Sequence, residues 1–249
     1  NGEKALNIAM QDHGGFNHND QTLRVLTHIE KRHPNFDGLN LTWESLEGVV
    51  KHNGIVSRNI PFHTKLYNDK HDLLLSKQPF LESQIAAISD DVAYNNHDVE
   101  DAIRAGLLSI DQLQENIFFN KIINQLKKEY SIIDDKLLMF QVLRKSMSLM
   151  IEDVYNNTNK NILDLEIKSK QDLQNCNDFI VTFSPVMQSK ANEIKSFLFD
   201  NVYNHQNLID KRQNVEKIIS NLFKYFYNSP NKLPNDWHNL NDPIERIIC

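Results

Sequence analysis

Apolar residues along the chain recur every three or four positions, which is the period of an amphipathic α-helix, and runs with the alternation of a β-strand are few. Only residues 179–183 could form a strand. The sequence therefore predicts an all-α fold, with helices over about residues 3–10, 19–33, 43–53, 80–95, 98–105, 110–130, 133–154, 185–204 and 208–227.

Polar residues mark several helix ends. Ser109 and Gln112 have the spacing of a capping box, and Ser184–Pro185 offers an N-cap followed by a proline at the first helical position. Residues 55–79 show little helical pattern, and we interpret them as a long connection of the kind that is often functional. Residues 156–161, rich in Asn, are interpreted as a turn.

The predicted central helix carries polar residues where a core helix would be apolar. Asp90, Tyr94 and Asp98 recur every fourth residue, so they share one helix face with about 6 Å of axial rise between neighbours. A metal ligand, an aromatic wall and a hydroxyl acceptor could share this face. Taken alone, the two acids could equally solvate or cap a helix, and the tyrosine could be a core aromatic.

Composition narrows the function classes. A formal net charge of −6 argues against an extended nucleic-acid footprint, and no phosphate-binding glycine loop is present. The two cysteines, Cys176 and Cys249, support neither a disulfide framework nor a thiolate zinc site, which fits a reducing cytoplasm. No apolar run reaches the roughly 18 residues of a membrane span, so we expect a soluble protein without membrane contact.

Four blocks of sequence, in order, carry a specific resemblance. They are Gly2–Glu3, GGFNHNDQTLR at 14–24, FDGLNLTWESLEGVVKHNG at 36–54 and AISDDVAYNNHD at 87–98. Together they resemble the bacterial deoxyguanosinetriphosphate triphosphohydrolase-like family of HD-domain hydrolases. The resemblance is strong over residues 1–110 and general beyond them. It implies an HD-domain helical fold with additional C-terminal helices, divided into a core over residues 1–160 and a helical region over 161–249 packed on that core.

The resemblance also implies roles for individual residues. Asp90 resembles the last ligand of a divalent metal, either Mg²⁺ or Mn²⁺ with iron or nickel as alternatives. Tyr94 and Asp98 resemble residues that pack on the deoxyribose and accept from its 3′-hydroxyl. Glu3 resembles a carboxylate that orients a catalytic histidine upstream, and His18 resembles the active-site histidine that contacts the phosphates. Asn19, next to His18, is assigned to substrate binding.

A triphosphate needs nearby cations, and the sequence does not choose among several. Arg144 is preferred, because a long helix could place its guanidinium over the pocket; a solvated surface cation is an equal alternative. The other candidates are Arg24, Lys51, Lys145, Lys211 and Arg212.

The family's first histidine, its His-Asp pair and the upstream histidine are absent from this sequence, and one carboxylate cannot hold a catalytic metal ion. We therefore expect the sequence either to begin inside a longer gene product or to be inactive as it stands.

The function expected is that of a metal-dependent hydrolase, which converts a deoxynucleoside triphosphate into a deoxynucleoside and tripolyphosphate and is assembled as a homo-oligomer. Two alternatives remain open. One is an HD phosphohydrolase that acts on another phosphate ester, and the other is a non-catalytic helical module that binds deoxynucleotides or forms oligomers.

Overall fold

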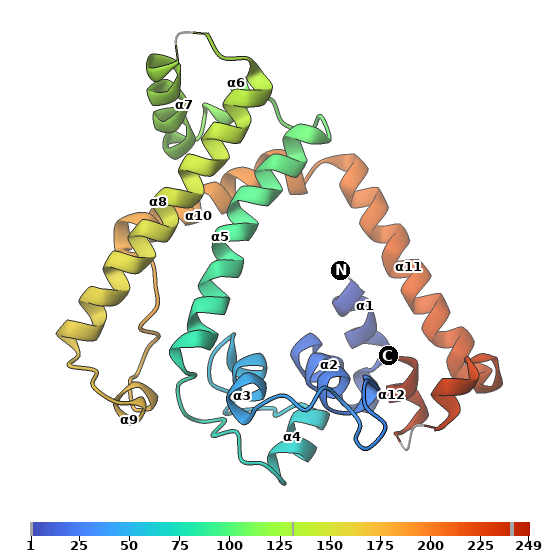
Figure 1. The fold of residues 1–249 in the computed structure, drawn as a ribbon. Helices are drawn as coiled ribbons and strands as arrows, with labels where there is room; N and C mark the ends of the chain where they lie inside the picture. Colours follow the sequence, from blue (N-terminus) through green and yellow to red (C-terminus); the bar gives the residue numbers. More distant parts are fainter. Residues whose placement is uncertain (1, 131, 240–241) are drawn as a thin grey trace. The chain divides into compact units, whose positions relative to one another are not determined.

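The computed structural model describes residues 2–130, 132–239 and 242–249, and the regular structure in these ranges is helical (Figure 1). Two isolated bridges, Lys31–Gly38 and His33–Phe36, are the β-type pairing found there. The all-α prediction is confirmed. The α-helices are α1 (Gly2–Ala9), α2 (His18–Arg24), α3 (Trp43–Lys51), α4 (Phe62–Asn68), α5 (Leu81–Arg104), α6 (Ile110–Leu113), α7 (Ile117–Glu129), α8 (Asp135–Asp164), α9 (Lys170–Gln174), α10 (Pro185–Leu198), α11 (Gln206–Asn228) and α12 (Ile244–Ile248).

Contacts divide the chain into two compact units. Unit 1 comprises Asn1–Lys51, Ile55–Ser76 and Asn207–Cys249, and unit 2 comprises His52–Gly54 and Lys77–Gln206. The boundary at residue 160 between a family core and a C-terminal region stays a prediction. Within the described ranges, no helix combines the length and apolar character needed to cross a bilayer.

A buried carboxylate connects two short helices of unit 1. Asp20 on α2 is 3% exposed, and its carboxylate accepts from the backbone N–H groups of His63 (3.2 Å) and Thr64 (2.6 Å) and from the Thr64 hydroxyl (2.8 Å). Free N–H groups at the start of a helix attract an acceptor of negative charge. Asp20 therefore caps α4 from a position more than forty residues away and fixes it against α2.

A buried guanidinium holds the C-terminal segment on α2. Arg24 is 1% exposed; its Nε and Nη2 lie 3.0 and 2.8 Å from Oδ2 of Asp242, and its Nη1 donates to the carbonyl of Arg246 at 2.7 Å. Arg246 in turn donates to the carbonyls of Gly15 (2.8 Å) and His13 (2.6 Å). These hydrogen bonds join residues more than two hundred positions apart in the sequence. They hold α12 against α2 and the loop before it.

The core of unit 1 contains an ion pair as well as apolar side chains. Leu23, Leu46 and Val50 pack together with Leu73 and Leu75. Beside them on α3, the Glu47 carboxylate and the Lys51 ammonium lie 2.5 Å apart with both side chains fully buried. The ammonium also donates to the carbonyl of Leu74 at 3.0 Å. The charge of each partner is therefore compensated inside the protein rather than by water.

Unit 2 is a helical bundle built on two long helices. α8 packs against α5 and α7, and α10 packs against α5 (Figure 1). Gln84 of α5 is fully buried, and its amide oxygen accepts from the backbone N–H groups of Ile180 (2.7 Å) and Val181 (3.1 Å). Residues 179–183 form no strand, and a side chain rather than a neighbouring strand satisfies these two N–H groups.

The structure corrects four sequence predictions of secondary structure. Helix α4 lies inside the segment predicted to be a non-helical connection, because Asp20 supplies its cap from elsewhere. The central helix is continuous from Leu81 to Arg104, without a break before Asp98. The capping box of Ser109 and Gln112 forms as predicted, but its helix ends at Leu113 and α7 starts anew after the N-cap Asn116. Residues 156–161 lie within α8 and do not form a turn.

Replacing Lys51 by Met is expected to lower the free energy of unfolding by about 3–5 kcal/mol, because the Glu47 carboxylate stays buried without its cation. Urea unfolding followed by far-UV circular dichroism measures this. The matched control is Arg104→Met, which removes the cation of an i,i+4 pair with Glu100 whose arginine is 59% exposed. The control is expected to cost less than about 1 kcal/mol. Equal losses in the two variants would contradict the structural role of the buried pair.

Candidate active-site clusters

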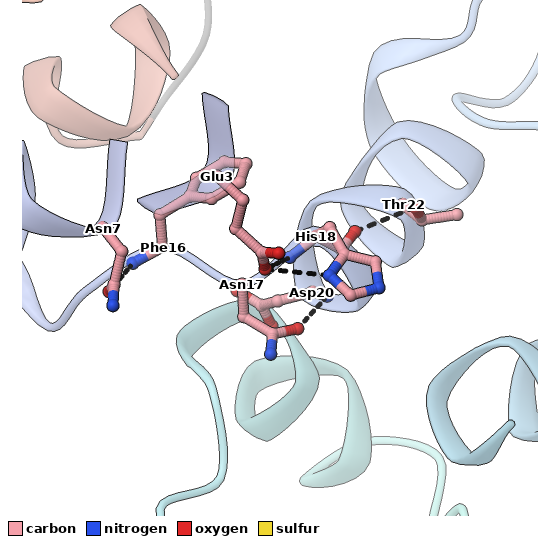
Figure 2. A network of polar contacts seen from close by, with 7 residues as sticks. All are labelled: Glu3, Asn7, Phe16, Asn17, His18, Asp20 and Thr22. Carbon is pink, nitrogen blue, oxygen red and sulfur yellow. Dashed lines mark hydrogen bonds and ion pairs between the residues drawn. The ribbon is translucent and has the colours of Figure 1, made fainter. Parts of the chain in front are cut away.

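The first cluster joins α1 to the start of α2. Oε1 of Glu3 lies 2.8 Å from Nδ1 of His18 and also accepts from the His18 backbone N–H at 3.0 Å (Figure 2). Both side chains are about half exposed. The family resemblance implied that Glu3 orients a histidine upstream of this sequence. In the structure, the Glu3 carboxylate contacts His18. One carboxylate oxygen thus fixes the orientation of the imidazole and directs Nε2 away from Glu3.

The loop before α2 determines where His18 is placed. Gly14 and Gly15 both have positive φ, +84° and +75°, which bends the chain back toward α1. The Asn7 side chain accepts from the backbone N–H of Phe16 at 2.9 Å, and Asn17 is the N-cap of α2, accepting from the N–H of Asp20 at 3.0 Å (Figure 2). The two glycines and the caps by Asn7 and Asn17 therefore determine where α2 begins and where His18 lies.

Asn19 follows His18 in the first turn of α2 and is half-buried. It stays a predicted substrate-binding residue on the basis of the family resemblance.

Contact with His18 alters the acidity of Glu3. Partial burial acts to raise the pKa of the Glu3 carboxyl, but the hydrogen bonds from the His18 ring and backbone and the electrostatic influence of His18 outweigh it, and the pKa is lowered. The carboxylate form is therefore favoured at neutral pH, in which it accepts from the imidazole.

The second cluster lies on α5 in unit 2. Asp90 and Tyr94 are exposed and Asp98 is half-buried, while Val92, Asn96 and Val99 on other faces of the helix are buried. Asn96 donates to the Val92 carbonyl at 2.7 Å and lies against the Met150 sulfur of α8. The continuous helix brings the three predicted residues onto one face, as their spacing indicated.

The sequence analysis missed Tyr203, which follows α10. Its hydroxyl donates to Oδ2 of Asp98. Burial, and then hydrogen bonding to Asp98 and Tyr94, raises the pKa of the Tyr203 phenol, so it stays protonated and acts as a donor. Tyr94, Asp98 and Tyr203 therefore form one polar cluster. No local signal singles out Tyr203, because its segment is separated from α5 by about a hundred residues.

Arg144 lies on the exposed side of α8, with its charge near the hydroxyl of Tyr130 at the end of α7. Its assignment to the triphosphate stays a prediction. Two of the alternative cations have structural partners instead, since Arg24 pairs with Asp242 and Lys51 with Glu47.

Asp90 is not part of a complete metal site among the described residues. Among residues 2–130, 132–239 and 242–249, no three His, Cys, Asp or Glu side chains lie close enough together to hold a metal ion. A catalytic divalent ion needs about three protein ligands, so the described residues do not fit a complete metal site.

Comparison with known proteins links these clusters to a family. Residues 181–249 match the model of the phosphohydrolase-associated domain. Three curated relatives bear the name deoxyguanosinetriphosphate triphosphohydrolase-like protein. The protein of Bartonella henselae is 42% identical across 100% of this chain and 65% of its own length. Those of Roseobacter denitrificans (39% identical) and Brucella ovis (36%) each match across 95% of this chain and 61% of their own length.

The chain is a homologue of the deoxyguanosinetriphosphate triphosphohydrolase-like proteins. The resemblance drawn from the sequence blocks is therefore confirmed, and the chain derives from a phosphohydrolase family. It spans between about three fifths and two thirds of the length of the curated relatives it matches.

Removing the partner of Glu3 should restore its ordinary acidity. In His18→Ala we expect the pKa of the Glu3 carboxyl to rise, because the hydrogen bonds from the imidazole are lost; ¹³C-detected NMR titration of the carboxyl carbon measures it. The pKa of Glu3 is lower in the folded protein than in the unfolded one, so its ionisation stabilises the fold at pH values above the unfolded-state pKa. This stabilisation is lost as the pH falls through the folded-state pKa. The exposed carboxyl of Glu82, at the start of α5, serves as the reference. An unchanged Glu3 titration in His18→Ala would show that the pair does not form in solution.

Proposed function

We propose that the protein hydrolyses deoxynucleoside triphosphates at the α-phosphorus, releasing a deoxynucleoside and tripolyphosphate. Water adds its oxygen to phosphorus, the bond to the 5′-oxygen breaks, and a proton passes to that oxygen. The names of the relatives support the substrate class. The observation that carries the proposal is the polar face of α5, on which Asp90, Tyr94 and Asp98 are aligned and Tyr203 is bonded to Asp98.

The cluster around Asp98 suits recognition of a deoxyribose. The Tyr203 phenol occupies Oδ2 of Asp98, and the other carboxylate oxygen can accept from the sugar's 3′-hydroxyl. The ring of Tyr94, 49% exposed, offers an apolar surface against which carbon 2′ can pack. A ribose would place its 2′-hydroxyl against this ring, where the hydroxyl would lose its hydrogen bonds to water without gaining one to the protein. The cluster therefore favours deoxynucleotides.

His18 suits the transfer of a proton and the neutralisation of phosphate charge. Glu3 contacts Nδ1 and fixes the ring, and we propose that Nε2, on the opposite side of the ring, faces a substrate oxygen. An imidazolium in that position donates a charge-assisted hydrogen bond to a phosphate oxygen or protonates the leaving 5′-oxygen. Asn19 and Arg144 are proposed as further contacts to the substrate.

The proposal includes a divalent ion, Mg²⁺ or Mn²⁺, with Asp90 as one ligand. Because the described residues do not complete a metal site, we assign no step of the reaction to the ion. A cytoplasmic location and assembly into a homo-oligomer, both expected from the sequence, belong to the same proposal.

Asp98→Asn in the intact gene product is expected to lower kcat/KM for tripolyphosphate release from dNTP at least tenfold, since an amide oxygen is a weaker acceptor than a carboxylate. Ion chromatography of the products measures it. The matched control is Asp91→Asn, next to Asp90 on α5, whose carboxylate pairs with Lys195 at 2.7 Å; it should retain near-parental activity. Release of monophosphate or diphosphate instead of tripolyphosphate would favour the other-ester alternative, and binding without turnover would favour the non-catalytic module.

His18→Ala should lower kcat by about 10²–10⁴, the usual contribution of a positioned acid or base, with a smaller change in KM. Single-turnover kinetics with dGTP measures the chemical step. Glu3→Gln, which keeps an acceptor for Nδ1 but removes its charge, should fall between the parent and His18→Ala. His33→Ala, in the loop before α3, is the control expected to match the parent. An effect confined to KM would assign His18 to binding alone.

A further inference from the structure

Unit 1 contains a second polar site that none of the proposed catalytic residues touches. It is a cavity of about 310 Å³. This volume lies within the range of small-molecule pockets. The polar side chains that line it and bear on the argument are His28, His63, Tyr67, Lys70, His71 and Asp242.

His63 is a buried polar group without a partner. Its side chain belongs to the first turn of α4 and is 8% exposed, and Nε2 has no hydrogen-bond partner in the part of the chain that the structure describes. Its backbone N–H donates to Asp20, and its ring packs edge-on against Phe62 at 5.0 Å. The residue is thus fixed on both sides while Nε2 stays unsatisfied. A buried nitrogen of this kind destabilises the folded state unless a ligand or water satisfies it.

The charge balance of the cavity favours an anion. Asp242 is its one carboxylate among the lining residues, and Arg24 already contacts that carboxylate through two nitrogens. Lys70, exposed at the cavity rim, has no ion pair in the described ranges, so its charge is not cancelled within the site. This local excess of positive charge occurs in a chain whose formal net charge is −6.

The remaining lining groups can donate hydrogen bonds. Burial lowers the pKa of His63, despite the opposing influence of Asp20 and Asp242, so its ring is neutral with one N–H at neutral pH. Burial raises the pKa of the Tyr67 phenol, which keeps its proton, and the His71 ring lies against the Tyr67 ring at 4.9 Å. The imidazoles do not form a metal site, because no set of three metal-ligating side chains gathers in the described residues.

We propose that this cavity binds the phosphate group of a small molecule, with Lys70 supplying the charge and His63 and Tyr67 donating hydrogen bonds. A tetrahedral phosphate has acceptor oxygens on every side, so it suits a cavity in which several donors surround the ligand. The site is separate from the proposed function and does not depend on it. Its ligand is free phosphate or a phosphomonoester, and the experiment distinguishes them.

The test is titration of the full chain with inorganic phosphate, followed by ¹H–¹⁵N spectra of the histidine side chains. Phosphate should shift the Nε2 resonance of His63 in a saturable manner, and dAMP should do so at lower concentration if the source is a phosphomonoester. Acetate is the control for carboxylates. Lys70→Gln should weaken binding at least tenfold. The control Lys65→Gln, exposed on α4 five residues before Lys70 but outside the cavity lining, should not.

Three results would overturn the proposal. These are equal phosphate affinity in Lys70→Gln and Lys65→Gln, a stronger response to acetate than to phosphate, and a response of His63 to Zn²⁺ alone. His63→Gln gives a second check on binding by calorimetry; because it retains an N–H donor it should bind phosphate, whereas His63→Leu should not. Because Lys70 is exposed, the Lys70→Gln variant is expected to fold even if substitution of the buried His63 prevents folding. The Lys70 variant therefore tests the proposal by itself. Loss of tripolyphosphate release in the catalytic variants leaves this titration unaffected.

Discussion

The continuity of α5 is the constraint on which the second proposed cluster depends. Positions i, i+4 and i+8 of one uninterrupted helix lie within about 80° of rotation on one side of it, so Asp90, Tyr94 and Asp98 need no further element to share a face. What keeps the helix in place is the burial of its other faces, where Gln84 binds the backbone before α10 and Asn96 lies against α8. An exposed functional face is tolerated because the remaining faces supply the packing.

Polar groups do much of the structural work in unit 1. Asp20 caps α4, Arg24 holds Asp242 and the α12 backbone, and Glu47 pairs with Lys51. Each of these groups is almost fully buried, and each is satisfied by a charged partner or by backbone donors and acceptors. His63 differs, since its Nε2 is buried and unsatisfied. That contrast within one unit is the reason for assigning the neighbouring cavity to a ligand.

Each of the two proposed clusters contains a carboxylate that is oriented by a hydrogen bond, but the elements that supply the bonded residues differ. Glu3 and His18 come from two helices, α1 and α2, and glycines of positive φ together with side-chain caps in the loop between them make their contact possible. Tyr94 and Asp98 come from one helix, but the donor that completes them, Tyr203, comes from a distant segment. In both cases a carboxylate is oriented by a hydrogen bond before any substrate arrives, which reduces the reorganisation that a reaction would require.

The sequence by itself determined the helical class, the caps at Ser109 and Ser184 and the common face of the α5 residues, because these depend on local periodicity and local hydrogen bonds. Its ordered motifs also identified the family. Only the tertiary structure decided that α4 is a helix, that Glu3 holds His18 and that Tyr203 belongs with Asp98. These features rest on partners distant in the sequence, and the periodicity of a chain carries no information about which distant residues meet.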